Sequence, residues 1–272
     1  MGYLHETLAT LRRSHAGAAM PGVAMPPWAE HCGDAWLMAM PDDFALQRRA
    51  MVAALRMRLM PLAGRFDTGA IERALAAMAD VPRERFVCPL VDDLAYLPGP
   101  VEIGHDQIMS HPELVAVLAA AADPRGGHVL DVGTGSGYQA AVLARMAAKV
   151  TSIEIIAPLA RLAASRLSRG GFDNVAVEAG DAATRRFGRD RFDAIVVAAG
   201  AASVPNALLC ALRPGGRLVM PIGPTGDLEH LVLLRKHANG GVSRTILRPA
   251  RFVPLTGAGA RAVSQEPTAG SL

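Results

Sequence analysis

The sequence predicts an α/β protein: a doubly wound, mainly parallel sheet with helices on both faces, preceded by a helical N-terminal region. Three observations favour this class. Apolar strand-like segments alternate with helix-like segments from residue 128 to about residue 256. The first of these strands runs into a glycine-rich turn at residues 133–137. The second delivers an acidic residue, Glu154. In such sheets, ligands bind beyond the carboxyl ends of the strands, so we expect the site there.

The composition is that of an ordinary globular enzyme. The chain has 272 residues, of which 51% are hydrophobic and 19% charged, and its formal charge is only +3. That excess does not favour nucleic acid as a partner, and no apolar run is long enough to span a bilayer. No signal peptide is evident, so we expect a cytoplasmic protein without a membrane partner. The cysteines lack CxxC spacing and His31-Cys32 has no partner nearby, so we expect no metal site.

The first 41 residues differ from the rest of the chain. Four prolines interrupt a segment that also holds both tryptophans, Trp28 and Trp36. We interpret residues 1–41 as a loop-rich arm that packs over the core; a substrate lid or an oligomer contact is the alternative. Residues 42–257 form the main domain, with a core at 128–235. The small, polar residues 258–272 are expected to be a mobile tail.

Helical signals begin at Asp42-Asp43, where an Ala-, Leu-, Met- and Arg-rich segment follows and continues up to Pro61. A second helix is expected over residues 68–79. From Pro82 to Gly104, prolines and glycines are frequent, and we expect no regular structure there. These features predict a helical region that leads by a loop into the sheet.

Ser110 begins the next helical pattern. Glu113 follows three residues later, and residues 114–122 are apolar. This is the capping-box pattern, so Ser110 is predicted to be a helix N-cap. Strands are then expected over residues 128–132, 150–154, 175–179, 193–198, 217–222 and 231–235, and helices over residues 139–147, 157–169 and about 204–212.

The glycine turn separates two classes of cofactor. A dinucleotide fingerprint has the spacing GxGxxG and places a pyrophosphate on a helix N-terminus. Here the glycines fall as GxGxG, and Asp131 stands just before the first of them. A carboxylate at that point opposes a pyrophosphate but suits an ammonium and a sulfonium, which S-adenosylmethionine carries. Glu154 is placed to accept both ribose hydroxyls. Because Asp131, Glu154 and Asp181 all lie at strand ends, we expect one ligand to reach all three.

Motifs on both sides of this turn resemble one known family. They are residues 81–87, 93–96, 103–105, Gln107 and Ser110 ahead of VLDVGTGSGYQAAVLA, then residues 192–193, 212–218, 221–223 and 251–256. Together, over roughly residues 42–257, they look like the protein-L-isoaspartate O-methyltransferase family. The resemblance implies a Rossmann-like class I methyltransferase fold. It also implies methyl transfer from S-adenosylmethionine, leaving S-adenosylhomocysteine, to the isoaspartate carboxylate of a peptide or protein. The ester then closes to a succinimide that reopens partly to aspartate.

The resemblance also implies residue roles. Ser110 is the catalytic, acceptor-side residue, Asp181 takes the adenine amino group, and Thr256 closes the site from a C-terminal strand. Asp181 has an alternative explanation as a turn cap. The implied cofactor-binding residues are Gln107, Ile108, Met109, Ser110, Asp131, Val132, Gly133, Thr134, Gly135, Gly137, Tyr138, Glu154, Asp181, Ala182 and Thr256. Because a carboxylate is already ionised at neutral pH, positioning and exclusion of water are expected to supply most of the catalysis.

The acceptor segment departs from the family pattern Gly-Gln-Thr-Ile-Ser. This chain has Asp106 in place of the glycine and Ile108 in place of the threonine. We therefore keep three hypotheses: an isoaspartate repair enzyme, a relative that methylates aspartate in one peptide natural product to give an aspartimide, and a non-catalytic binding module. Ser110 and the three acidic residues at strand ends argue against the last, and we favour the first.

Overall fold

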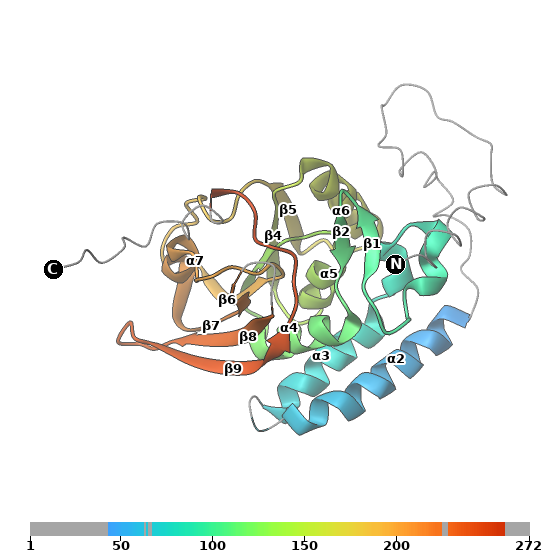
Figure 1. Ribbon diagram of the computed structural model, residues 1–272, viewed down its shortest axis with the longest axis horizontal. Helices are drawn as coiled ribbons and strands as arrows, with labels where there is room; N and C mark the ends of the chain where they lie inside the picture. The colour runs from blue at the N-terminus through green and yellow to red at the C-terminus, as the bar shows by residue number, and fades with distance from the viewer. Residues whose placement is uncertain (1–42, 63, 65–66, 225–227, 259–272) are drawn as a thin grey trace.

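A computed structural model describes residues 43–62, 64, 67–224 and 228–258 (Figure 1). The expected arm at residues 1–41 and, except for residue 258, the expected tail lie outside these residues. A seven-stranded sheet in the order β5-β4-β3-β6-β7-β8-β9 forms the centre, and helices flank it, which confirms the predicted α/β class. Within the described part of the chain, no helix is both long enough and apolar enough to cross a membrane.

The sheet is mainly parallel. Its strands are β3 (His128–Val132), β4 (Lys149–Glu154), β5 (Val175–Ala179), β6 (Phe192–Val197), β7 (Leu212–Ile222), β8 (Glu229–Lys236) and β9 (Val242–Ala250). The first five run parallel, and β8 and β9 add an antiparallel edge. All six expected strands are present. β9 was not expected, because most of its residues are exposed and its sequence shows no apolar alternation.

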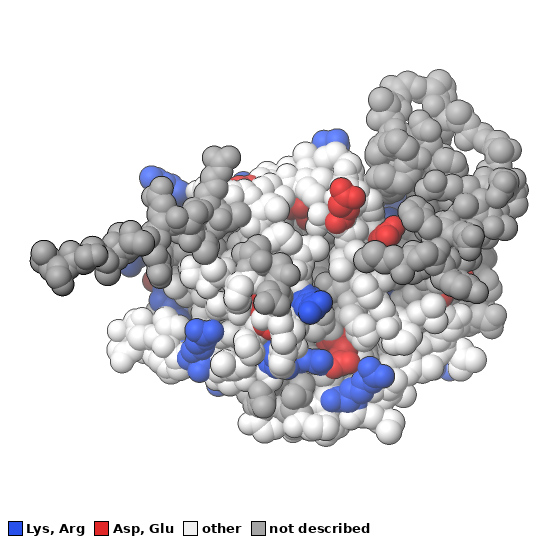
Figure 2. All heavy atoms as spheres, viewed as in Figure 1, with Lys and Arg blue, Asp and Glu red and all other residues white. Residues whose placement is uncertain are grey.

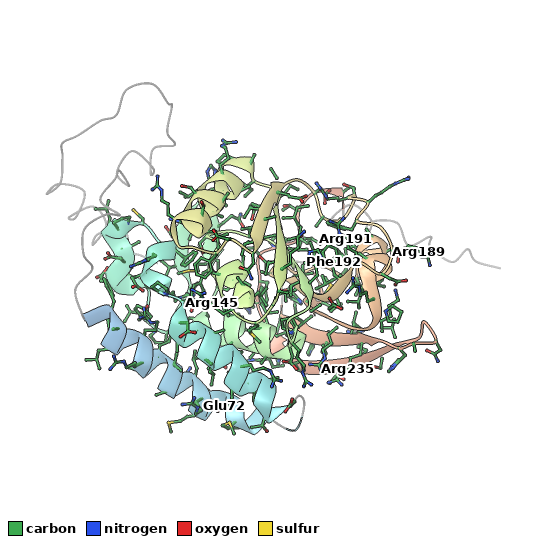
Figure 3. All side chains as sticks on the ribbon, turned by 180° about the vertical axis from the view of Figure 1, so that it is seen from behind. Glu72, Arg145, Arg189, Arg191, Phe192 and Arg235 are labelled. Atoms are coloured by element: carbon green, nitrogen blue, oxygen red, sulfur yellow. The ribbon has the colours of Figure 1, made fainter. Side chains whose placement is uncertain are left out.

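The helices are α2 (Asp43–Leu59), α3 (Thr68–Asp80), α4 (Pro112–Ala122), α5 (Tyr138–Ala144), α6 (Ala157–Arg169) and α7 (Asn206–Ala211). α2 and α3 lie side by side, and α3 packs on α4 (Figure 1). An exposed ion pair of 2.8 Å joins Arg56 of α2 to Glu72 of α3, which is labelled in Figure 3. These helices carry the predicted helical N-terminal region.

Two hydrophobic clusters fill the two faces of the sheet. Val129 and Val150 belong to the cluster that includes residues of α2 to α6, whereas Leu130 and Ile153 belong to the cluster that includes α7. Neighbouring residues of one strand point to opposite faces, so both clusters depend on the same strands. The sheet is therefore covered on both sides, and its open end is left for a ligand.

The prediction that residues 82–104 lack regular structure was wrong. Two 3₁₀ helices occur here, η3 (Arg83–Phe86) and η4 (Pro89–Leu94), and β1 (Val101–Gly104) pairs antiparallel with β2 (Gln107–Met109). His105 and Asp106 connect the two strands with φ angles of 54° and 56°. Such left-handed angles are those of a two-residue hairpin turn, which aspartate tolerates better than most residues. The prolines flank these elements rather than exclude them.

The prediction of Ser110 as the N-cap was also wrong. The cap is His111, whose Nδ1 accepts the backbone N–H of Glu113 at 3.0 Å. Pro112 occupies the first helical position, which suits its fixed φ, so the helix begins one residue later than expected. Glu113 does not return to the cap: its carboxylate pairs with Arg248 and, at 3.3 Å, with Arg58. Ser110 is thereby left outside the helix.

Candidate active site

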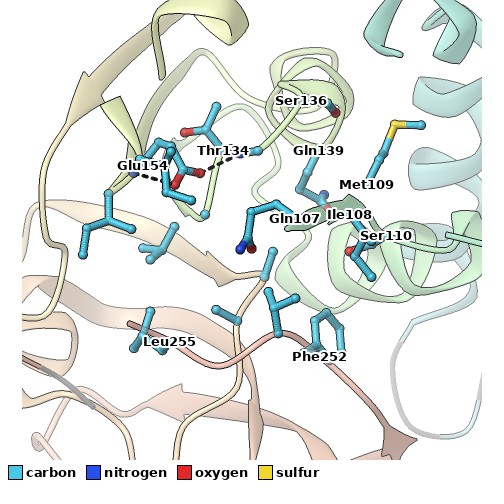
Figure 4. Close-up of a pocket in the computed structure, with 18 of the residues that line it drawn as sticks. Gln107, Ile108, Met109, Ser110, Thr134, Ser136, Gln139, Glu154, Phe252 and Leu255 are labelled. Atoms are coloured by element: carbon cyan, nitrogen blue, oxygen red, sulfur yellow. Dashed lines mark hydrogen bonds between the residues drawn. The ribbon is translucent and has the colours of Figure 1, made fainter. Parts of the chain in front are cut away.

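A cavity of about 290 Å³ opens beyond the carboxyl ends of β3, β4 and β5 (Figure 4). Five groups of residues form most of its wall: the glycine turn after β3, the end of β4, the loop after β5, the residues after β6, and β2 with the residues that lead into α4. Residues 251–256 close it from the other side. On the face of the molecule seen in Figure 1, basic and acidic side chains of the described residues are interspersed (Figure 2).

All the predicted site residues except Asp131 and Gly137 line this cavity. The lining ones are Gln107, Ile108, Met109, Ser110, Val132, Gly133, Thr134, Gly135, Tyr138, Glu154, Asp181, Ala182 and Thr256. Segments far apart in the sequence therefore meet at one end of the sheet, as the rule for doubly wound sheets requires.

Glu154 ends β4 and supports the glycine turn. Its Oε2 accepts the backbone N–H of Gly135 at 2.8 Å, and its Oε1 accepts that of Ile156 at 3.0 Å. The residue is 6% exposed and still lines the cavity. A carboxylate offers about four lone-pair sites, so each oxygen keeps one for a ligand.

Asp131 lies behind the cavity wall. Its side chain is fully buried, and its Oδ2 accepts the Ser152 hydroxyl at 2.7 Å. The Ser152 hydroxyl lies 2.6 Å from that of Thr134, which lines the cavity. Burial raises the pKa of Asp131 to about 7; the Ser152 hydrogen bond opposes this, and the charge of Glu154 adds to it. Of the three strand-end carboxylates, those of Glu154 and Asp181 thus line the cavity directly. Asp131 is linked to it only through the hydroxyls of Ser152 and Thr134.

Gly137 has a structural reason to be glycine. Its φ is 95°, it precedes α5, and a Cβ there would lie 3.4 Å from the side chains of Ala163 and Leu167 on α6. The left-handed angle lets the chain turn into α5, and the missing side chain leaves room for Ala163 and Leu167 of α6. Gly137 therefore stabilises the turn without lining the cavity.

Asp181 is a turn cap that also faces the cavity. Its Oδ1 accepts the backbone N–H of Ala183 at 2.8 Å, which is the expected turn cap, and its Oδ2 accepts that of Ala258 at 2.9 Å. It also lines the cavity. The contact with residue 258 ties the C-terminal segment to the loop after β5.

Residues 251–256 do not form the expected closing strand. Only Pro254 makes a β-bridge, to Gly200, while the Gly200 N–H donates to Val253 O and the Leu255 N–H to Gly200 O. The buried Glu229 accepts the N–H of Phe252 at 3.1 Å. Proline and these irregular bonds prevent a continuous ladder, yet the segment still places Thr256 at the cavity.

Ser110 is positioned by Arg83, which is completely buried. The Arg83 guanidinium donates to Ser110 O at 2.8 Å and to Ala95 O at 2.7 Å, and it lies 4.7 Å from the centre of the Tyr138 ring. Burial lowers the pKa of Arg83. One side chain thus fixes the Ser110 backbone against the start of α5.

Sequence reasoning missed several wall residues. Gln139, on the first turn of α5, was predicted only to be helical, although its position next to the glycine turn was a usable signal. Ile155 follows Glu154 directly in the sequence, which was a second signal, and the structure leaves it 41% exposed. Arg251 and Phe252 had no signal beyond the family motif, because their place at the cavity depends on how the last segment crosses the sheet end.

The wall fits S-adenosylmethionine. The glycine turn presents backbone rather than side chains, since Gly133 and Gly135 have φ angles of 88° and 52°. The Glu154 carboxylate has lone pairs left that can accept hydroxyl groups, and the exposed Ile155 gives an apolar surface beside it. The cavity volume is at the lower end of the range for small-molecule sites. The site therefore has the donors, acceptors and open backbone that a nucleoside with an amino-acid tail needs.

Comparison with known proteins gives a consistent result. A family profile described as protein-L-isoaspartate(D-aspartate) O-methyltransferase matches residues 65–260. A protein-L-isoaspartate O-methyltransferase 2 from Polaromonas sp. is 44% identical over 187 residues, 68% of this chain and 89% of that protein. One from Rhodopseudomonas palustris (strain HaA2) is 42% identical over 229 residues, 84% of this chain and 90% of that protein.

Solved structures show the same fold. A Plasmodium falciparum protein-L-isoaspartate O-methyltransferase, crystallised with S-adenosyl-L-homocysteine, superposes with a TM-score of 0.60 at 24% identity, over 75% of this chain and 97% of that one. A second protein-L-isoaspartate O-methyltransferase gives a TM-score of 0.66 at 24% identity, over 79% of this chain and 67% of that one.

Proposed function

The chain belongs to the protein-L-isoaspartate(D-aspartate) O-methyltransferase family, and we propose that the cavity beyond β3, β4 and β5 is its active site. It is an S-adenosylmethionine-dependent methyltransferase of isoaspartyl residues. One observation carries the proposal. The Glu154 carboxylate, the glycine turn and Ser110 come from three separate elements and line a single cavity. A ribose acceptor, an open backbone cradle and an acceptor-side hydroxyl are the three parts that the reaction needs.

The cofactor side is formed by the β3–β5 end of the wall. S-adenosylmethionine, when bound, supplies an electrophilic methyl group on a sulfonium. Glu154 would accept its ribose hydroxyls, Asp181 its adenine amino group, and the glycine turn would surround its methionine part. Asp131 would act on that part through Ser152 and Thr134, since no atom of its side chain reaches the cavity.

The acceptor side lies around Ser110. The acceptor carboxylate is ionised at neutral pH, so no residue has to remove a proton from it. The Ser110 hydroxyl donates a hydrogen bond to it, and Arg83 fixes the backbone that carries this hydroxyl. Met109, Leu114 and Val115 line the same region and exclude water, which strengthens the remaining electrostatic contacts.

The partner is a peptide or protein substrate, and we propose a broad acceptor range with the reaction in the cytoplasm. The exposed Ile108, 40% accessible at the cavity edge, offers an apolar contact but no hydroxyl. Recognition then depends on the acceptor carboxylate and the substrate backbone, which every isoaspartyl peptide carries. The specialised alternative, aspartate in a single peptide, differs in the acceptor and would share the cofactor side.

A Ser110→Ala variant tests this assignment. Losing one hydrogen bond to a charged group costs about 1.5–3 kcal/mol, so kcat/KM for an isoaspartyl peptide should fall roughly 10- to 100-fold. The dissociation constant of S-adenosylhomocysteine should stay within about twofold. Ser168→Ala, on the exposed end of α6, is the matched control and should change neither. Unchanged turnover by Ser110→Ala would place the acceptor elsewhere.

A further inference from the structure

Gln139 is a buried polar side chain whose role the fold itself does not explain. It is the second residue of α5, it is 7% exposed, and it lines the cavity. Among the described residues, neither its Nε2 nor its Oε1 has a hydrogen-bond partner. Buried amides in folded proteins are normally paired, so an unpaired one in a cavity wall indicates a group that a ligand completes.

Several other polar side chains of the same wall are already paired, although the Tyr138 hydroxyl, like the Gln139 amide, has no hydrogen-bond partner among the described residues. Glu154 and Asp181 each accept two backbone N–H groups, and the Thr134 hydroxyl pairs with that of Ser152. Gln107 donates to the carbonyl of His105 at 3.3 Å. Gln139 differs because both ends of its amide are open. A protein gains nothing in folding from such a group, since leaving it unpaired costs free energy.

The position of Gln139 assigns it to the acceptor side. In Figure 4 it lies on the same side of the cavity as Met109 and Ser110, and Glu154 lies on the opposite side. The cofactor side presents carboxylates, which are hydrogen-bond acceptors. The side chains of Ile108 and Met109 offer no donor, so a carboxylate ligand beside Ser110 needs donors from other lining residues, and among these Gln139 has an unpaired buried amide.

We infer that the Gln139 amide is a specificity-determining contact for the acceptor, donating from Nε2 to the acceptor carboxylate and accepting at Oε1 a backbone N–H of the substrate peptide. This inference rests on the proposed function. A primary amide has two N–H donors and one carbonyl, which matches a carboxylate beside a peptide N–H. The contact recognises groups that every isoaspartyl peptide has, so it favours a peptide acceptor over a free carboxylic acid without selecting a sequence.

Two substitutions test the inference against the wild-type chain. With Gln139→Leu, KM for an isoaspartyl peptide should rise about tenfold, while the dissociation constant of S-adenosylhomocysteine stays within twofold. The melting temperature of the ligand-free variant should not fall, because an unpaired amide is replaced by an apolar group of similar size. With Gln139→Glu, the added negative charge opposes the acceptor carboxylate, so KM should rise further than with leucine.

Gln47→Leu on α2, remote from the cavity, is the matched control and should leave all three quantities unchanged. Weaker S-adenosylhomocysteine binding by Gln139→Leu with an unchanged peptide KM would overturn the inference in favour of a cofactor contact. A lower melting temperature with both constants unchanged would overturn it in favour of a structural role. If the wild-type chain methylates the isoaspartyl peptide and both Gln139 variants do so equally well, this inference alone is refuted and the proposed function is retained.

Discussion

Replacing Glu154 by glutamine tests the cofactor side most sharply, because the change keeps the shape of the side chain. The carboxylate accepts Gly135 N–H at 2.8 Å and Ile156 N–H at 3.0 Å. The glutamine amide keeps one acceptor oxygen, and its NH₂ group, which cannot accept a hydrogen bond, takes the place of the second oxygen. One backbone N–H therefore loses its partner, and one ribose hydroxyl loses a charged acceptor.

The two losses have separate magnitudes. An unpaired buried N–H costs about 1–3 kcal/mol of unfolding free energy, or roughly 2–4 °C in melting temperature for each kcal/mol in a domain of this size. A hydrogen bond to a charged group contributes about 1.5–3 kcal/mol, so the dissociation constant of S-adenosylhomocysteine should rise roughly 10- to 100-fold. Isothermal titration calorimetry below the melting temperature of the variant measures this constant directly.

Asp193→Asn is the matched control for the loss of stability. Asp193 accepts the backbone N–H of His128 at 2.7 Å and pairs with Arg213 at 2.9 Å, and it does not line the cavity. It should lower the melting temperature and leave the dissociation constant unchanged. If Glu154→Gln binds S-adenosylhomocysteine as tightly as Asp193→Asn does, the ribose role of Glu154 is refuted.

Two further predictions concern buried charged groups. Because burial raises the pKa of Asp131 to about 7 from an ordinary 3.8, the folded state holds its proton where the unfolded chain has released it, and stability falls as pH rises from about 4 to 7. Asp131→Asn removes this titration, so the free energy of unfolding of the variant relative to wild type should rise across that window by at most about 1.4 kcal/mol per pH unit. Chemical denaturation of both proteins at pH 5, 6 and 7 measures this difference. A difference that does not change with pH would contradict the raised pKa of Asp131. Arg83→Met leaves the carbonyls of Ala95 and Ser110 without their buried donor and should cost about 2–5 kcal/mol of stability. Its kcat should fall more than its S-adenosylhomocysteine affinity, and an unchanged kcat in the folded variant would show that Arg83 does not position Ser110.

The parallel core and the cofactor wall were readable from the sequence, because each depends on local patterns. Buried parallel strands are apolar throughout, and the glycine turn has a spacing that suits few ligands. Of the antiparallel edge, β8 was expected but β9 was not: only Leu247 and Ala250 of the β9 side chains are buried, so no apolar pattern marks it. β9 pairs with β8 across the short connection 237–241, so the Asn239-Gly240 turn was the one local signal for it.

The acceptor side was less predictable for a similar reason. The capping-box pattern at Ser110 was present, but Pro112 moved the helix start and gave the cap to His111. Whether Gln139 faces a neighbour or a cavity depends on how α5 packs against α3, α4 and the large sheet, and no local pattern records that. Likewise, the buried Arg83 reaches Ser110 across 27 residues of sequence.

The central claim is tested most directly by methyl transfer to a matched pair of short peptides that differ only in containing isoaspartate or aspartate. Purified chain and S-adenosylmethionine are incubated with each peptide, and mass spectrometry measures the gain of one methyl group or loss of water after succinimide formation. We expect the isoaspartyl peptide alone to be methylated. Methylation of the aspartyl peptide alone, or of neither peptide by a chain that binds S-adenosylhomocysteine, would contradict the account.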